Sequence, residues 1–148
     1  ATLAAGVGQY VLAIPVTLAQ ITGAGDVLTT HTLGHKFKIL DIDFFVTTAV
    51  TTAAKLATLN LEIGTTDLTG GTVALTSANC TPLGATVAGS AITAANTGSS
   101  TDTISIEAAS VTAFAEGAGV LLIRIQNMDI ADAVASLVTH LENLGLAT

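Results

Sequence analysis

The feature that most constrains the fold of this chain is a period-two alternation of apolar residues, which recurs in short segments. In the segment ATLNLEIG (residues 57–64), Ala, Leu, Leu and Ile alternate with Thr, Asn and Glu. Because successive side chains of a strand point to opposite faces, this pattern predicts a strand with one buried face. Further segments with strand signals occupy residues 11–22, 26–33, 35–46, 72–77, 84–92, 102–108 and 121–126. About eight short strands predict a mainly β fold, an antiparallel and jelly-roll-like β-sandwich.

Three backbone signals refine this prediction. Pro15 has no amide hydrogen to donate, so its segment should be an edge strand. Within HKFKILDIDFFV (residues 35–46), apolar residues change from odd to even positions, which predicts either a β-bulge near Ile39–Asp41 or a strand buried on both faces. Gly117 and Gly119 precede the last strand, and we expect both to shape its turn because glycine tolerates positive φ.

The apolar period changes at the C-terminal end of the chain, where one helix is predicted. Apolar residues there lie at helical spacing: Ile130, Val134, Leu137, Val138, Leu141 and Leu144. Asp129 is the expected N-cap and Gly145 the expected stop, so residues 130–144 should form an amphipathic helix. Its apolar stripe must be buried, on the chain's own sandwich or on a neighbouring subunit. We therefore expect a sandwich domain over residues 1–128, followed by the helix and a tail over residues 129–148.

The low charge of the chain points to a surface covered by other protein. Half of its 148 residues are hydrophobic and 10% are charged, whereas a soluble domain has roughly 25% charged residues. We interpret the deficit as surface buried in a homo-oligomer or a larger assembly. The alternative is a monomer coated with Thr and Ser, which hydrate well.

The sign of the charge argues against two classes of partner. Four Lys and Arg residues oppose eleven Asp and Glu, for a net charge of −7. Nucleic acid is bound by neutralising phosphates, so it is not an expected partner. Attraction to an anionic membrane is disfavoured for the same reason, and no apolar run approaches the ~18 residues that span a bilayer.

Few side chains suggest chemistry. Asp41 and Asp43 form a DxD pair that shares one face of a strand, but two ligands are too few for a metal site. His31 and His35 lie four residues apart beside a glycine turn rather than on a helix, so we do not expect zinc. Cys80, the single cysteine, should be a small buried residue. We predict no catalytic, cofactor-binding or metal-binding residues.

The motif content does not favour an enzyme. The chain has no GxSxG elbow, phosphate-binding glycine loop or HExxH pair. A carboxylate pair for glycoside hydrolysis depends on separation in space, which sequence does not show. A glycan cleft usually exposes stacking aromatics, and this chain has no Trp and one Tyr. A hydrolase is therefore the lowest-ranked alternative.

Arg124 is the most distinctive side chain of the last strand. Its parity is opposite to that of the predicted core residues, so it should point outward between Leu122 and Gln126. Arginine is enriched in protein interfaces, where we expect it to pair with a carboxylate, such as Glu62 or Glu107 of the same or a neighbouring subunit. The alternative is that Arg124 is a solvated charge at the edge of the sheet, without a role in an interface. The predicted interface residues are Leu122, Arg124, Ile130, Val134 and Leu141.

Two longer segments carry a family resemblance. These are ATLNLEIGTTDLTGGTVALTS and GSAITAANTGSSTDTISIEAASVTAFAEGAGVLLIRI, in which a strand, a TGG hairpin, a DTI strand and an FAEGAGVLLIRI strand follow one another. Over residues 37–128 the chain resembles small Ala/Thr/Gly-rich β-sandwich proteins encoded among the structural genes of tailed bacteriophages. Several of these are capsid decoration (cement) proteins. The C-terminal helix is outside the resemblance.

The resemblance implies a non-enzymatic structural role. Decoration proteins bind the outer capsid surface as oligomers, often trimers, and stabilise the lattice. The implied partners are the major capsid protein and further copies of the chain, and the implied location is the outer surface of a virion assembled in the host cytoplasm. The alternatives are another phage module, such as a tail or fibre component, or a sandwich that binds a glycan or other ligand.

Overall fold

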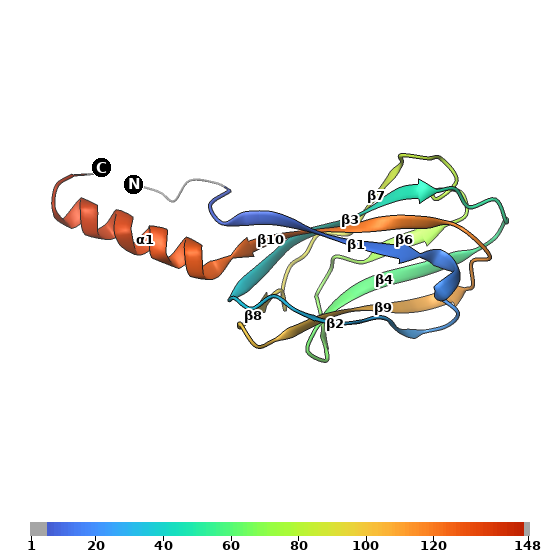
Figure 1. Ribbon diagram of the computed structural model, residues 1–148, viewed down its shortest axis with the longest axis horizontal. Coiled ribbons are helices and arrows are strands. Elements are labelled where there is room, and N and C mark those ends of the chain that lie inside the picture. The colour runs from blue at the N-terminus through green and yellow to red at the C-terminus, as the bar shows by residue number, and fades with distance from the viewer. Residues whose placement is uncertain (1–5, 147–148) are drawn as a thin grey trace.

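The computed structural model describes residues 6–146, so residues 1–5 of the predicted domain and residues 147–148 of the predicted tail lie outside the described chain. In this range the chain forms ten strands, a 3-10 turn η1 (Leu18–Gln20) and one helix. The elements are shown in Figure 1. The bounds of strands and helix are β1 (Gln9–Thr17), β2 (Gly25–Thr32), β3 (Phe37–Thr48), β4 (Leu56–Ile63), β5 (Thr66–Asp67), β6 (Val73–Thr76), β7 (Thr86–Ala88), β8 (Thr97–Gly98), β9 (Thr103–Thr112), β10 (Ala118–Asn127) and α1 (Met128–Asn143).

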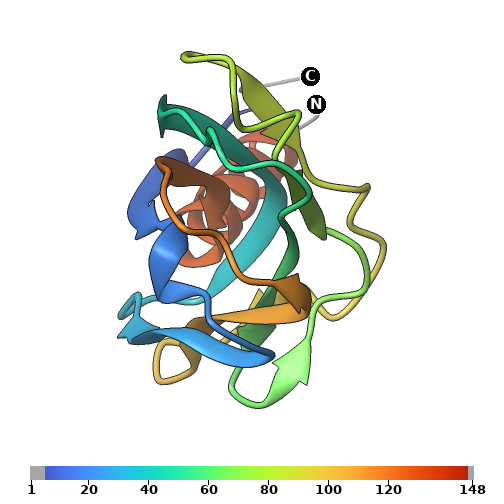
Figure 2. The ribbon, with the colours of Figure 1, turned by 90° about the vertical axis from the view of Figure 1, so that its right-hand side faces the viewer.

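The strands form two antiparallel sheets that face each other, as the view along the sandwich in Figure 2 shows. Sheet A has the order β1-β10-β3-β7, with β8 also paired to β3, and sheet B has the order β2-β9-β4-β5, with β6 also paired to β4. If the two-residue strands β5 and β8 are set aside, the chain order is first, eighth, third and sixth in sheet A and second, seventh, fourth and fifth in sheet B. This alternation of a chain between two sheets is the jelly-roll topology, which confirms the predicted fold class.

The core fills the space between the sheets with side chains from both. Its largest fully buried members are Leu18, Ile21, Phe37, Ile39, Phe44, Leu59, Leu61, Leu75, Ile104, Ile106, Leu121 and Ile123. Most of these are the inward members of the alternating segments, so the period-two pattern located the core correctly. Full burial of each large apolar side chain contributes about 1.5–3 kcal/mol.

Two of the backbone predictions are confirmed. β1, which carries Pro15, lies at the edge of sheet A and pairs with β10 alone among the described strands. The register between β10 and β3 passes from Arg124↔Asp41 to Ile125↔Ile39, which leaves Leu40 as an extra residue. This bulge lies inside the predicted Ile39–Asp41 and accounts for the change of parity along β3.

Two local predictions are corrected. Between the predicted strands over residues 84–92 and 102–108, where no strand was expected, the chain forms β8, which pairs with the start of β3. Gly117 has the predicted positive φ, of 105°, but Gly119 does not. Gly119 is required by close packing instead, because a Cβ at that position would overlap the ring of Phe44 and the carbonyl oxygen of Phe45.

β10 runs directly into α1 without an intervening loop. The N-cap is Asn127 rather than the expected Asp129, and its side-chain oxygen accepts hydrogen bonds from the backbone N–H groups of Asp129 (3.0 Å) and Ile130 (3.2 Å). At the other end Gly145 has φ 75°, its N–H donates to the Glu142 carbonyl, and the next N–H donates to the Leu141 carbonyl. This is a Schellman stop, so the predicted C-terminal end of the helix is confirmed.

The helix extends away from one end of the sandwich instead of lying on it (Figure 1). Ala131, in the first turn, is the single fully buried residue of Met128–Asn143. Within the described residues, the chain's own sandwich therefore leaves most of the apolar stripe uncovered. No helix within residues 6–146 has the length and apolarity needed to cross a membrane.

The packing at Gly119 gives a test of the sheet A core. Gly119→Ala places a methyl group against backbone that cannot give way, so we expect the free energy of unfolding to fall by about 1–3 kcal/mol. Gly23→Ala is the matched control, because a Cβ at Gly23 meets nothing within 4 Å. Chemical denaturation of both variants measures the difference. Equal stability of the two variants would contradict the packing described for β10 and β3.

Candidate functional site

The outer face of sheet A carries a compact set of apolar residues. Three cross-strand rows span β1, β10 and β3 on this side: Val11–Arg124–Asp41, Ala13–Leu122–Asp43 and Pro15–Val120–Phe45. We call these nine residues the sheet A face. Six of them are apolar, and Val11 and Phe45 are 59% and 38% exposed. A contiguous apolar surface of this kind is typical of a contact with another protein.

Arg124 pairs with Asp41 near one end of the sheet A face. The two residues are directly opposite in the β10–β3 register, and the guanidinium Nη2 donates to the Asp41 carboxylate. Their side chains are 50% and 45% exposed, so the pair is partly solvated. It lies in a shallow depression of about 200 Å³ lined by Val11, Asp41, Asp43, Leu122 and Arg124. The depression thus combines one ion pair with a second carboxylate and two apolar side chains.

The predicted intrachain partners of Arg124 are wrong. Glu62 and Glu107 belong to β4 and β9 of sheet B, whereas Arg124 lies on β10 of sheet A. The sequence contained the correct partner, Asp41, but the pairing depends on the bulge at Leu40, which sets the Arg124↔Asp41 register. The outward direction of Arg124 is as predicted.

The five predicted interface residues belong to two separate surfaces. Leu122 and Arg124 are on the sheet A face, whereas Ile130, Val134 and Leu141 are on α1. Ile130 is 49% exposed, and Val134 and Leu141 are half-buried. Sequence reasoning missed Val11 on β1 and Phe45 on β3. Both alternate with the inward residues of their strands, and this alternation could have indicated that they point outward.

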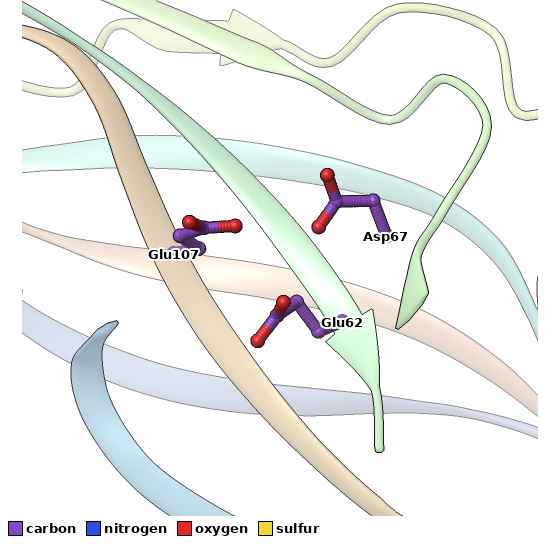
Figure 3. A group of neighbouring side chains, drawn as sticks. All are labelled: Glu62, Asp67 and Glu107. Carbon is purple, nitrogen blue, oxygen red and sulfur yellow. The ribbon is translucent and has the colours of Figure 1, made fainter. Parts of the chain in front are cut away.

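The outer side of sheet B has a different character, because three carboxylates gather there around β4 (Figure 3). The oxygens of Glu62, Asp67 and Glu107 lie within 4.8 Å of one another. Glu62 faces Asp67 in the β4–β5 register, and Glu107 faces Asp26 in the β2–β9 register. Four acids therefore share this side of sheet B, which we call the acidic face. The Ser105 hydroxyl donates a hydrogen bond to the Glu62 carboxylate at 3.1 Å.

Crowding on the acidic face changes the protonation of Glu107. Partial burial raises the pKa of the Glu107 carboxyl above its usual value, and the neighbouring charges of Asp67 and Glu62 raise it further. Three carboxylates also offer oxygen ligands of the kind that Ca²⁺ prefers, although a calcium site takes six to eight. The arrangement is thus a concentration of negative charge that disfavours burial against protein.

The remaining candidate residues are held in ordinary structural roles. His35 Nε2 is 2.6 Å from the Tyr10 hydroxyl and its Nδ1 is 3.0 Å from the Lys36 carbonyl oxygen, so both ring nitrogens are engaged. His31 is exposed on β2 and is in no group of metal-ligating side chains among the described residues. Cys80 is fully buried, as predicted, and burial raises the pKa of its thiol.

Comparison with protein-family models, with curated proteins and with solved structures found no match to the chain. The surfaces on which a partner could bind are therefore identified from the structure of the chain itself. These are the apolar sheet A face, the acidic face of sheet B and the uncovered stripe of α1.

The acidic face predicts a pH-dependent stability. Folding raises the pKa of the Glu107 carboxyl, so the folded state favours its protonated form. The contribution of the carboxyl to the stability of the folded state is therefore present at low pH and is lost as pH rises through the folded pKa. Glu107→Gln should therefore raise the thermal midpoint at pH 7, and the gain should shrink as pH falls and the native Glu107 becomes protonated. Asp43→Asn removes one carboxylate from sheet A and is the control. A lower midpoint for Glu107→Gln at pH 7, or equal shifts for both variants, would contradict the repulsion.

Proposed function

We propose that the protein is a non-enzymatic structural component of a phage virion that binds the outer capsid surface as a homo-oligomer, most simply a trimer, and stabilises the lattice. Its partners are then the major capsid protein and copies of itself. Neither nucleic acid nor membrane is a partner in this proposal, because the chain carries four Lys and Arg residues against eleven acids.

The observation that carries the proposal is the uncovered apolar surface on sheet A. Leu122 and Val120 lie at its centre, flanked by the exposed side chains of Val11 and Phe45. Protein interfaces combine an apolar centre with a few polar groups and are enriched in Arg and aromatic residues. The sheet A face has this composition, with the Arg124–Asp41 pair at one end.

The two faces of the sandwich differ in a way that gives the molecule an orientation. Burial of carboxylates against protein costs free energy unless they are paired. The acidic face carries Asp26, Glu62, Asp67 and Glu107 with no cation among the residues that form it. We infer that the sheet A face meets the capsid while the acidic face stays in water.

The resemblance of residues 37–128 to phage sandwich proteins supports the choice of a capsid as the partner. A capsid repeats one binding surface many times. An oligomer that binds several neighbouring capsid subunits at once gains avidity from modest individual contacts, and its contacts across subunits oppose their separation. This role requires surface complementarity and no catalytic group.

The stoichiometry of purified particles tests the proposal. Quantitative mass spectrometry of virions from the phage that encodes the chain should find it in a fixed whole-number ratio to the sites of the capsid lattice. A copy number typical of a tail or fibre would support that alternative module and contradict a lattice role. Absence from the particle would contradict any virion role.

Arg124→Ala tests the sheet A face. Loss of a half-exposed ion pair should change the free energy of unfolding by less than ~1 kcal/mol. Capsid binding should nevertheless weaken, because Asp41 would be left unpaired in the interface. Lys55→Ala is the matched control, since it removes the same charge from the segment before β4 of sheet B. Co-sedimentation with capsids that lack the protein measures binding. Equal occupancy of both variants would show that Arg124 is only a solvated charge.

A further inference from the structure

We propose that α1 packs in parallel against α1 of other copies of this chain, as a short left-handed coiled coil. The inference names the contact that holds together the homo-oligomer of the proposed function, on which it rests. Three features of the helix support this packing: the spacing of its apolar residues, the placement of its charges and its attachment to the sandwich.

The spacing of the exposed stripe is that of a heptad repeat. Ile130, Val134, Leu137, Leu141 and Leu144 are separated by four, three, four and three residues. This spacing averages 3.5 residues over two heptads, which is the period of a coiled-coil seam. A strict 3.5 period places Ile130, Leu137 and Leu144 at d positions and Val134 and Leu141 at a positions. A matching helix of the same chain is the natural cover for such a seam.

The residues beside the seam fit the same partner. Ala131 and Val138 occupy e positions, and Ala133 and His140 occupy g positions. The acids of the helix, Asp129, Asp132 and Glu142, fall at the outer positions c, f and b. Identical helices packed in parallel would therefore bring no carboxylates together at e and g, where like charges oppose association. Small and apolar flanks also widen the seam beyond two residues per heptad, which suits more than two helices.

The sandwich fixes where each helix starts and in which direction it runs. The Met128 N–H donates to the Lys36 carbonyl (2.8 Å), and the Lys36 N–H donates to the Asp129 carboxylate (3.2 Å). The Lys36 ammonium also contacts the Asp132 carboxylate at 3.0 Å. With the Asn127 cap, these contacts tie the first turn to β3 and β10. Copies arranged around an axis would then present their helices at the same height, as parallel packing requires.

The helix needs such a cover. Ile130, Leu137 and Leu144 are 49%, 56% and 58% exposed. Most of the stability of a protein helix comes from tertiary packing of its apolar face, and α1, with 16 residues, is close to the length at which an isolated helix is marginal in water. Of its residues, the chain's own sandwich fully buries Ala131 alone. An anionic membrane is a poor alternative cover, because the helix has three acids and neither Lys nor Arg.

A pair of matched variants tests the contact in solution. Leu137→Asp puts a charge into the seam at a residue that is 56% exposed in the single chain, so the sandwich should fold normally. Ser136→Asp puts the same charge on the neighbouring exposed position outside the seam. Light scattering should find a multiple of 14.7 kDa for the native protein and Ser136→Asp, and a monomer for Leu137→Asp. A monomeric native protein, or equal masses for both variants, would overturn the inference.

A cysteine at the end of the seam tests the direction of packing. In parallel helices the Leu144 positions of two copies lie side by side, whereas in antiparallel helices each would lie opposite Ile130, about 21 Å away along the axis. Leu144→Cys should form a disulfide-linked dimer under oxidation, since that bond requires Cα atoms within about 7 Å. The native protein is the control, because its Cys80 is buried. An oligomer of Leu144→Cys that does not cross-link would overturn parallel packing.

These results are separable from those on the proposed function, because solution mass and cross-linking need no capsid. A protein that associates through α1 but is absent from virions would refute the capsid role alone. A protein that decorates capsids while Leu137→Asp remains oligomeric would refute the coiled coil alone.

Discussion

β10 is the element on which the rest of the structure depends. It is hydrogen-bonded to β1 on one side and β3 on the other, at the centre of sheet A. Its inward residues Leu121, Ile123 and Ile125 are at most 1% exposed, while Leu122 and Arg124 point to the sheet A face. The same strand ends at the Asn127 cap and continues as α1. One ladder of backbone hydrogen bonds thus positions a core row, an interface row and the start of the helix.

The small number of charged residues and their placement determine which surfaces of the molecule are polar and which are apolar. Two of its four cations form ion pairs, Arg124 with Asp41 and Lys36 with Asp132. Much of the acid is concentrated on sheet B, where water stabilises it, and the sheet A face and the α1 seam are left apolar. Solvent-exposed apolar rows on the outer face of sheet A and on the helix that follows it are costly in a monomer and useful in an assembly. This division of polar and apolar surface is the physical basis of the proposed role.

Features that depend on neighbours along the chain could be predicted from sequence, and features that depend on register could not. Alternation located the strands and the core, and a break in alternation located the bulge at Leu40. The Arg124 partner was missed because it lies 83 residues away and is set by that bulge. Asn127 was missed as the cap because it also ends a strand, and Asp129 was expected to cap a helix that begins at Ile130. The acidic face combines residues of four strands, β2, β4, β5 and β9, whose order no local pattern shows.

Hydrogen exchange of the intact protein tests the central claim, that β10 delivers α1 to another copy of the chain. If the helices pack together, amides of α1 beyond its first turn should exchange slowly at high protein concentration and faster on dilution, while amides of central β10 stay protected throughout. Exchange of α1 at the rate of an unstructured peptide at every concentration would contradict the account. Slow exchange that is unchanged on dilution to the monomer would contradict it equally, because the helix would then be stabilised within a single chain.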